Sequence, residues 1–173
     1  VRLGAAVRLT ELAQSAALRT MLPGLCAGVE LIATRQVRNR ATVAGDLCQQ
    51  NRCWFFRSAK PCYRFAGPTA PCYAVCGDNR HHSILGAGRC AAPCVSDLAP
   101  MLSALRAEVV ATGRRAERRV PVAMLYRWAG QTVLAPDEWI TSIEWVPQPG
   151  AAFHFAKYMR WKGDFAEASV AAY

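Results

Sequence analysis

Residues 46–100 read DLCQQNRCWFFRSAKPCYRFAGPTAPCYAVCGDNRHHSILGAGRCAAPCVSDLAP, and they hold most of the chain's thiols. Seven of the eight cysteines lie between Cys48 and Cys94, and Cys26 stands elsewhere. Residues 50–95 follow neither the helical period nor the two-residue period of a strand. A long irregular stretch inside a compact domain needs something other than secondary structure to hold it. We therefore expect the cysteines to do so, as disulfides, as a zinc site or as an iron–sulfur cluster.

The disulfide interpretation is the least favoured of the three. Small secreted domains use disulfides when they cannot build a hydrophobic core, and they need an oxidising compartment. This chain has 173 residues, of which 53% are hydrophobic, with five Trp and six Phe. It is therefore long and apolar enough to bury a core without such bonds.

Spacing alone does not separate zinc from an iron–sulfur cluster. Cys72 and Cys76 form one short pair and Cys90 and Cys94 another, thirteen residues apart, which is close to the paired pattern of tetrahedral zinc sites. An iron–sulfur cluster needs four thiolates, typically in an apolar shell. The aromatic residues of CWFF and CYRF, which follow Cys53 and Cys62, offer such a shell.

The flanking sequence predicts mixed helix and strand. The clearest helix follows Ser96, which stands at the cap position before apolar residues at helical spacing (Leu98, Met101, Leu102 and Leu105). Two further helices are expected, over residues 11–19 with Thr10 as the cap and over residues 24–34. The expected strands are residues 107–112, 119–123, 138–146 and 153–161, and PQPG at 147–150 predicts a turn.

The net charge of +9 suits an anionic cofactor, an acidic partner subunit or nucleic acid. Four arginines stand in GRRAERR, residues 113–119, between two apolar runs, which predicts a hairpin with a charged tip. No aromatic residues alternate with these arginines, so a nucleic-acid surface is not favoured. No apolar run approaches the roughly 18 residues of a membrane span.

Two segments on either side of the cysteines carry a family resemblance. ATRQVRNRATVAGDL, residues 33–47, and SDLAPMLSALRAEV, residues 96–109, resemble the FAD-binding subunit of the molybdenum hydroxylases. In that superfamily of xanthine and aldehyde oxidoreductases, carbon monoxide dehydrogenase and 4-hydroxybenzoyl-CoA reductase, the motifs read approximately SPQIRNVGTVGGNL and SDLAPALLALDAEV. Residues 118–147 and 153–173 are similar to the segments that follow in the family, in the same order.

The resemblance implies an α+β fold. Residues 1–147 would form the second lobe of the FAD-binding domain, with an irregular cysteine-rich loop at 48–95, and residues 148–173 the start of a truncated C-terminal α/β domain. Relatives begin with a small lobe that carries a glycine-rich loop, approximately AGGTD, and nothing similar precedes Val1. We therefore expect an internal piece of a longer protein, without its N-terminal lobe.

A subset of the family carries a cysteine-rich insertion that binds a [4Fe–4S] cluster. NRCWFFR, KPCYRF, APCYAV and GDNRHHSILGAGRC are similar to its parts. The resemblance implies that the metal ligands are Cys53, Cys62, Cys72 and Cys90. It also implies that Cys48, Cys76 and Cys94 are spectators, while the zinc quartet of Cys72, Cys76, Cys90 and Cys94 stays open. His81 and His82 are weaker candidates beside these thiolates, and Cys26 reads as a small buried hydrophobe.

The same resemblance places FAD on the glycine motif. Glycine permits close approach of the backbone, and the N–H groups of a tight loop bind phosphate. The implied contacts are Thr42, Val43, Ala44, Gly45 and Asp46, with Ser96 and Asp97 opposite and Ile140 and Lys157 beside the flavin. The family's GGN is AGD here, and the charge of Asp46 would weaken cofactor binding. Without the resemblance, the motif reads as a plain turn and Lys157 as a solvated strand residue.

We therefore expect an electron-transfer flavoprotein and iron–sulfur subunit of a molybdenum-containing aldehyde or N-heterocycle oxidoreductase, with no catalytic residue for the molybdenum chemistry itself. The implied partners are a large molybdenum-cofactor subunit and a small subunit with [2Fe–2S] clusters. The small subunit would relay electrons to FAD, and the present subunit would pass them to an acceptor. The expected compartment is the cytoplasm, or the periplasm for a complex exported as a whole. The alternatives are a zinc-stabilised basic interaction module without redox activity, and a fragment that keeps the fold but binds neither cofactor.

Overall fold

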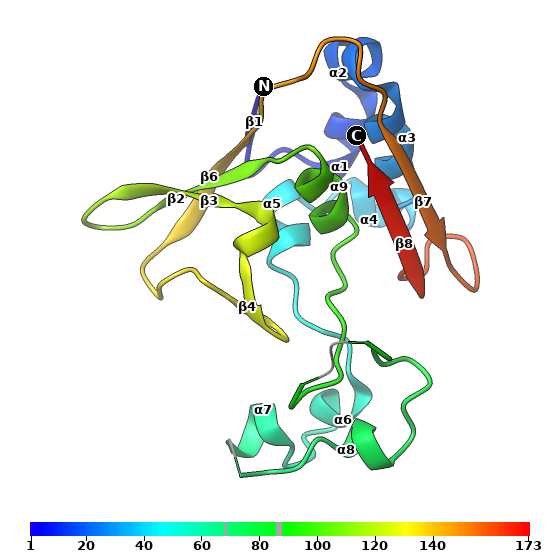
Figure 1. Cartoon of the computed structure of the whole chain (residues 1–173), viewed down its shortest axis with the longest axis vertical. Helices are drawn as coiled ribbons and strands as arrows, with labels where there is room; N and C mark the ends of the chain where they lie inside the picture. Colours follow the sequence, from blue (N-terminus) through cyan, green and yellow to red (C-terminus); the bar gives the residue numbers. More distant parts are fainter. Residues whose placement is uncertain (68, 86–87) are drawn as a thin grey trace. The chain divides into compact units, whose positions relative to one another are not determined.

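The cysteine-rich segment forms a compact unit of its own. The computed structural model describes residues 1–67, 69–85 and 88–173. The chain divides into a first unit of Val1–Gln49, Ser96–Arg127 and Thr132–Tyr173, and a second unit of Gln50–Val95 and Trp128–Gln131 (Figure 1). The second unit is therefore mainly an insertion into the first.

The first unit is built on a four-stranded antiparallel sheet with the strand order β1-β6-β2-β3. Its strands are β1 (Arg2–Gly4), β2 (Glu108–Thr112), β3 (Glu117–Pro121) and β6 (Trp139–Glu144). In the central strand β2, Val109 lies opposite Val120 on one side and Ile143 on the other, and all three are buried. The apolar residues of this strand therefore hold the sheet to the core.

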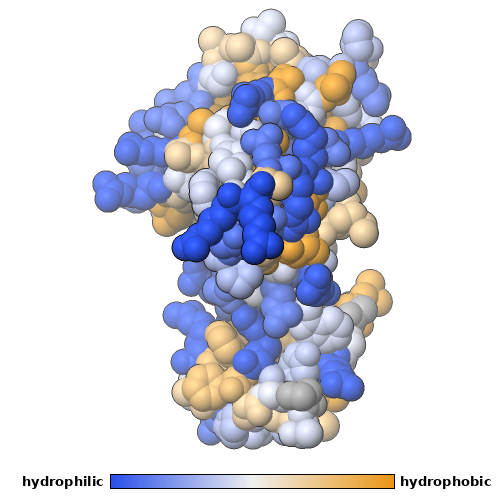
Figure 2. Space-filling model, turned by 90° about the vertical axis from the view of Figure 1, so that its left-hand side faces the viewer, coloured by the Kyte–Doolittle hydropathy of each residue, from blue (hydrophilic) through white to orange (hydrophobic). Residues whose placement is uncertain are grey.

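The hairpin predicted from GRRAERR is confirmed. β2 and β3 pair in register on either side of residues 113–116, with Arg118 and Arg119 already in β3, and the arginines of the motif are exposed. Figure 2 views the molecule from the side toward which this hairpin projects in Figure 1, and hydrophilic residues gather there. Arg118 forms a two-pronged ion pair with Glu138, and Arg119 pairs with Glu144. Part of the basic charge is therefore neutralised within the sheet.

Short helices surround the core of the first unit. They are α1 (Leu9–Gln14), α2 (Ala16–Met21), α3 (Pro23–Glu30), α4 (Arg35–Arg38), α5 (Val43–Leu47), α9 (Leu98–Ala104) and the 3-10 turn η1 (Val122–Met124). Helix α3 packs against α1, α2 and α9, and α9 also contacts α5 and η1. The helix predicted after Ser96 is confirmed, since Leu98, Met101, Leu102 and Leu105 are all almost fully buried.

Two helix predictions differ from the structure, and the helix expected over residues 24–34 ends at Glu30. Residues 11–19 do not form one helix capped by Thr10, because the helix breaks at Ser15 and Thr10 lies inside α1. Ser15 is extended, and its Oγ accepts a hydrogen bond from the Leu18 N–H, 3.4 Å away, so it caps α2. The Thr10 hydroxyl instead donates to Oδ1 of Asn39 at 2.6 Å. The local cap at Ser15 therefore overrides the continuous pattern.

The segment after the predicted PQPG turn belongs to the first unit. The Ala151 N–H donates to the carbonyl of Gln148 at 3.2 Å, which confirms the turn. The strands β7 (His154–Tyr158) and β8 (Ala168–Ala172) then form an antiparallel hairpin. β7 packs on α3 and β8 on α9. The boundary at residue 148 stays a prediction.

The second unit is as irregular as its sequence indicates. Its regular elements are the one-turn helices α6 (Trp54–Arg57), α7 (Tyr63–Ala66) and α8 (Tyr73–Cys76). A two-stranded ribbon, β4 (Tyr126–Trp128) and β5 (Gln131–Thr132), frames the 128–131 segment. In the three described stretches of the chain, no helix is long and apolar enough to cross a membrane.

The close packing of α3 predicts a severe effect of Gly24→Ala. A Cβ atom at Gly24 would stand 1.9 Å from the carbonyl oxygen of Phe153, which is backbone and cannot turn aside. We expect a loss of about 1–3 kcal/mol in the free energy of unfolding, measured by urea denaturation. The matched control is Gly4→Ala, whose Cβ would meet only Val7 at an ordinary 3.7 Å. Equal stability of the two variants would contradict the packing described here.

Candidate functional site

Helix α5 presents an exposed backbone turn. Thr42 caps this helix, because its Oγ1 accepts a hydrogen bond from the Gly45 N–H at 3.1 Å. Gly45 is exposed, and a Cβ atom there would come within 2.9 Å of the same oxygen. Val43 is fully buried in the core. A ligand at this turn would therefore meet the backbone of Gly45 rather than a side chain of Val43.

The Asp46 side chain faces α9. Its Oδ1 atom accepts hydrogen bonds from the Ser96 hydroxyl and from the Leu98 N–H, the second at 3.2 Å. Ser96 Oγ in turn accepts from the Ala99 N–H at 3.1 Å, so it bonds the first turn of this helix as predicted, although Asp97 rather than Ser96 is the N-cap residue. With only 6% of Asp46 exposed, the carboxylate ties α5 to the start of α9.

Lys157 reaches the same region from β7. Its Nζ lies 2.7 Å from Oδ2 of Asp97 and 3.4 Å from the Leu31 carbonyl oxygen. The side chains of Lys157 and Asp97 are 0% and 6% exposed, so the reading of Lys157 as a solvated strand residue was wrong. Asp46, Ser96, Asp97 and Lys157 thus bring α5, α9 and β7 together, and they are called the polar cluster below.

Burial raises the pKa values of the two acids of the polar cluster. It raises the pKa of Asp46 to about 6, against the hydrogen bonds from Ser96 and the Leu98 N–H, which lower it. Burial also raises the pKa of Asp97, although the hydrogen bond and charge of Lys157 lower it. The cluster therefore holds two carboxyl groups with one ammonium group, and one of those carboxyls titrates close to neutral pH.

Ile140 stands apart from these polar residues. It lies on β6 opposite Ala111, and its side chain packs in the hydrophobic core with 8% exposed. The residues predicted for FAD therefore comprise the turn at α5, the polar cluster and one core position. Sequence reasoning did not find the bonds from Asp46 to α9, because they join residues about fifty positions apart.

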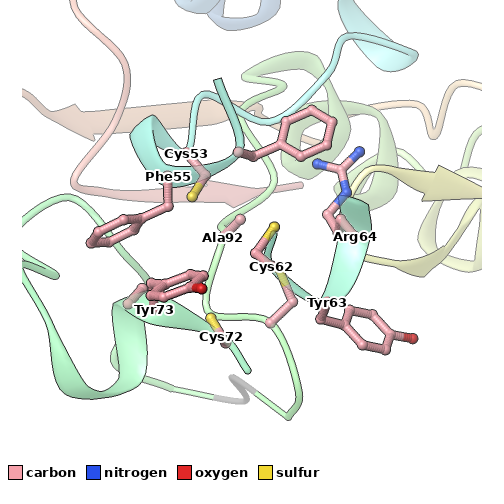
Figure 3. A pocket seen from close by; sticks show the side chains of 11 residues that line it. Cys53, Phe55, Cys62, Tyr63, Arg64, Cys72, Tyr73 and Ala92 are labelled. Atoms are coloured by element: carbon pink, nitrogen blue, oxygen red, sulfur yellow. The ribbon is translucent and has the colours of Figure 1, made fainter. Parts of the chain in front are cut away.

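The four cysteines predicted as cluster ligands line one pocket of the second unit. Cys53, Cys62, Cys72 and Cys90 share it with aromatic residues that include Phe55, Phe56, Tyr63 and Tyr73. Figure 3 shows the sulfur atoms of the three labelled cysteines directed into this space. Their segments are brought together although 36 residues lie between the first cysteine and the last in the sequence.

Three of these cysteines share a local geometry that sequence reasoning missed. Cys53, Cys62 and Cys72 are the N-cap residues of α6, α7 and α8. Each is followed by an aromatic residue, in CW, CY and CY, and this repeat was the available signal. The three thiols therefore reach the pocket from the starts of three one-turn helices.

The remaining cysteines are placed differently. Cys48, Cys76 and Cys94 are exposed, and Cys26 is buried, where desolvation raises the pKa of its thiol. All eight cysteines lie in the described part of the chain, and all are free thiols. The disulfide interpretation is therefore wrong for this structure.

The geometry does not form a single-ion site. Among residues 1–67, 69–85 and 88–173, no three His, Cys, Asp or Glu side chains gather closely enough to hold one metal ion. Tetrahedral zinc needs its thiolates about 2.3 Å from one point, and two members of the zinc quartet, Cys76 and Cys94, are exposed outside the pocket. A [4Fe–4S] cluster places a different demand, since each thiolate binds a different iron and the four surround the cluster.

Asn51 and Arg64 link the beginning of the second unit to its end. Asn51 is 4% exposed, and its Nδ2 donates to the carbonyl oxygen of Pro93. Its Oδ1 accepts from Arg64 at 3.2 Å, and the Arg64 guanidinium also bonds Gln50 and lies 4.3 Å from the centre of the Phe56 ring. These contacts join the start of the second unit to its end beside the pocket.

His82 contacts one of the pocket cysteines. Its Nε2 lies 3.2 Å from Sγ of Cys53, and its ring packs against Trp54 and Phe55. Burial lowers the pKa of His82, which favours the neutral imidazole. His81 is exposed and packs on Trp54 with ring centres 5.1 Å apart.

Comparisons with known proteins agree on one family. The model of the FAD binding domain in molybdopterin dehydrogenase matches residues 1–149. The chain is 32% identical over 178 aligned positions to the aldehyde oxidoreductase FAD-binding subunit PaoB of Escherichia coli strain K12. That alignment covers 98% of the chain and 55% of PaoB.

Solved structures show the same fold. The chain is similar to carbon monoxide dehydrogenase of Hydrogenophaga pseudoflava, with a TM-score of 0.69 and 22% identity, over 97% of this chain and 44% of that one. It is also similar to quinoline 2-oxidoreductase of Pseudomonas putida 86, with a TM-score of 0.67 and 20% identity, over 98% and 45%. The chain spans about half the length of the relatives it matches.

The buried carboxyl of Asp46 predicts a pH-dependent stability that Asp46→Asn removes. Its pKa of about 6 in the folded state lies above its ordinary value of 3.8. At pH values between 3.8 and about 6, Asp46 binds more protons in the folded state than in the unfolded state. The contribution of Asp46 to the free energy of unfolding therefore falls as the pH rises. As the pH rises from 4 to 7, the free energy of unfolding of Asp46→Asn should increase relative to that of the wild type by about 3 kcal/mol at most.

Urea denaturation across this range measures the difference between variant and wild type. The exposed carboxylate of Asp137 supplies the matched control, Asp137→Asn, which should follow the wild-type curve. If Asp46→Asn also follows the wild-type curve, Asp46 does not titrate as a buried acid.

Proposed function

The chain belongs to the family of FAD-binding domains of molybdopterin dehydrogenases, and we propose that it is the FAD-binding, electron-transferring part of a molybdenum hydroxylase-type oxidoreductase. The observation that carries this proposal is the family match over residues 1–149. The similarity to PaoB favours an aldehyde over an N-heterocycle as the substrate of the whole enzyme. Within such an enzyme, FAD would accept electrons from the reduced metal centres and pass them to an acceptor.

The turn at α5 fits the demands of FAD. Gly45 leaves the backbone open, since no side chain covers it and a Cβ atom would crowd Thr42. We assign the contacts with the cofactor to Thr42, Ala44 and Gly45. Val43 holds the turn to the core, and Asp46, buried under it, orients the turn through its bonds to α9.

The rest of the polar cluster would position the flavin side of the site. Lys157 neutralises Asp97 within the protein, and the pair joins β7 to the start of α9. Removing one partner from a buried ion pair leaves an uncompensated charge. In this proposal, Ser96, Asp97 and Lys157 hold the protein rigid beside the flavin, and Ile140 supports this arrangement from β6 by packing in the hydrophobic core.

A [4Fe–4S] cluster held by Cys53, Cys62, Cys72 and Cys90 is the second part of the proposal. Its support is that these four thiols line one aromatic pocket, and that three of them stand at the N-cap positions of one-turn helices. An apolar shell limits solvent around a cluster and tunes its potential. When bound, the cluster would supply one-electron transfer. The zinc-stabilised interaction module is not favoured, because its quartet is not assembled among the described residues.

The partners follow from the same proposal. They are a large subunit with the molybdenum cofactor and a small subunit with [2Fe–2S] clusters. The basic surface suits docking to such subunits, and the ion-paired arginines of the β2–β3 hairpin speak against a nucleic-acid role. We propose the cytoplasm as the compartment, with the periplasm as the alternative for a complex that is exported as a whole.

The cluster assignment predicts the colour and iron content of the protein. Anaerobically purified protein should be brown, with about four irons and four sulfides per chain. Cys53→Ser should lose most of the iron because a ligand is gone, and Cys76→Ser should keep it. Cys76 is the matched control, since it stands in the same unit but is exposed outside the pocket. A colourless protein with one zinc per chain would instead establish the interaction module.

The flavin assignment predicts that Gly45→Val weakens FAD binding at least tenfold. The added side chain would cover the open backbone and press on Thr42 Oγ1, 2.9 Å from the new Cβ. Titration of the protein into FAD, followed by flavin fluorescence, measures the affinity, and circular dichroism checks the fold. Gly4→Ala should bind as wild type does. Equal binding by Gly45→Val would remove the α5 turn from the site.

A further inference from the structure

His82 holds a fixed orientation against one of the pocket cysteines. Its Nε2 atom lies 3.2 Å from Sγ of Cys53, within hydrogen-bonding distance for sulfur. The main-chain N–H of His82 donates to the Asn79 carbonyl oxygen at 2.8 Å, which anchors the backbone. The ring centres of Trp54 and Phe55 lie 5.6 and 6.0 Å from the imidazole. Backbone and packing together therefore aim the ring at the sulfur.

The surroundings of the other ring nitrogen select the tautomer. Nδ1 of His82 is buried and has no hydrogen-bond partner among the described residues. A buried N–H without an acceptor is costly, and the thiolate sulfur beside Nε2 can only accept a hydrogen bond. The proton therefore belongs on Nε2, where it meets the sulfur of Cys53.

We infer that His82 donates an N–H···S hydrogen bond to the Cys53 thiolate and thereby raises the reduction potential of the cluster. This inference rests on the proposed function, because it takes Cys53 to be a cluster ligand. Hydrogen bonds to cluster sulfurs are among the protein's means of setting the potential. The reduced form carries one more negative charge, so a donor at the thiolate stabilises it more than the oxidised form.

His82 acts in this step without itself reacting. A cluster held by the four cysteines would take up one electron from a reduced donor, such as the flavin or a partner's iron–sulfur centre, and that donor would be oxidised by one electron. His82 keeps its proton in both states, and no bond forms or breaks at its ring. It is therefore a positioning residue that acts through Cys53.

The test is a redox titration of anaerobically purified protein, followed by electron paramagnetic resonance. His82→Phe keeps a ring against Trp54 and Phe55 but removes the donor, so its midpoint potential should become more negative. We expect about a tenfold lower ratio of reduced to oxidised cluster at a fixed potential, which corresponds to about 59 mV for one electron. His82→Gln keeps an N–H donor and should restore most of the wild-type value.

The neighbouring histidine supplies the matched control. His81 also packs on Trp54 but is exposed, so His81→Phe should leave the potential unchanged. Iron and sulfide are counted in every variant. If His82→Phe keeps its iron and its potential, or if His82→Gln behaves as His82→Phe, the hydrogen bond does not set the potential.

Two further outcomes separate the inference from the proposed function. Loss of iron in both His82 variants, with wild-type protein fully loaded, would make His82 a ligand or a structural residue and overturn the inference alone. Wild-type protein without iron and sulfide would overturn the cluster assignment itself. A shifted potential in His82→Phe with full iron, and none in His81→Phe, supports both.

Discussion

The buried carboxylate of Asp46 is the contact on which the arrangement of the chain depends. It accepts hydrogen bonds from Ser96 and from the Leu98 N–H, and so joins the two places where the chain leaves and re-enters the first unit. The cysteine-rich residues in between can then form a unit of their own without disturbing the core. Closing such a loop costs conformational entropy, and the cost grows only slowly with loop length.

A hydrogen bond also joins the two ends of the main segment of the second unit. Asn51 stands just before the first pocket cysteine and bonds the carbonyl oxygen of Pro93, just after the last one. Arg64 holds the Asn51 side chain from within the unit and stacks over Phe56. With so little regular secondary structure, these polar contacts and the aromatic rings are what hold the pocket. A group bound by all four cysteines would tie the same segments together.

Charge is used differently at the surface and in the interior. The pairs of Arg118 and Arg119 with glutamates on the sheet are exposed to solvent, where ion pairs add little stability. Lys157 and Asp97 are buried, and removing two charges from water is expensive. The buried pair of Lys157 and Asp97 is therefore better explained by the elements that it positions than by a gain in folding stability. It places the end of β7 against the start of α9, beside the turn at α5.

The sequence by itself determined the elements whose causes are local. The spacing from Leu98 to Leu105 predicted α9, the apolar runs around GRRAERR predicted the β2–β3 hairpin, and two motifs led to the family. The spacing of the cysteines left zinc and an iron–sulfur cluster open, because spacing along the chain does not report distance in space. The resemblance named four cysteines, and the tertiary structure places those four around one pocket. It also decided that Asp46 caps α9 and that Lys157 is buried. Those contacts join residues fifty and sixty positions apart, and only the packing of the core brings them together.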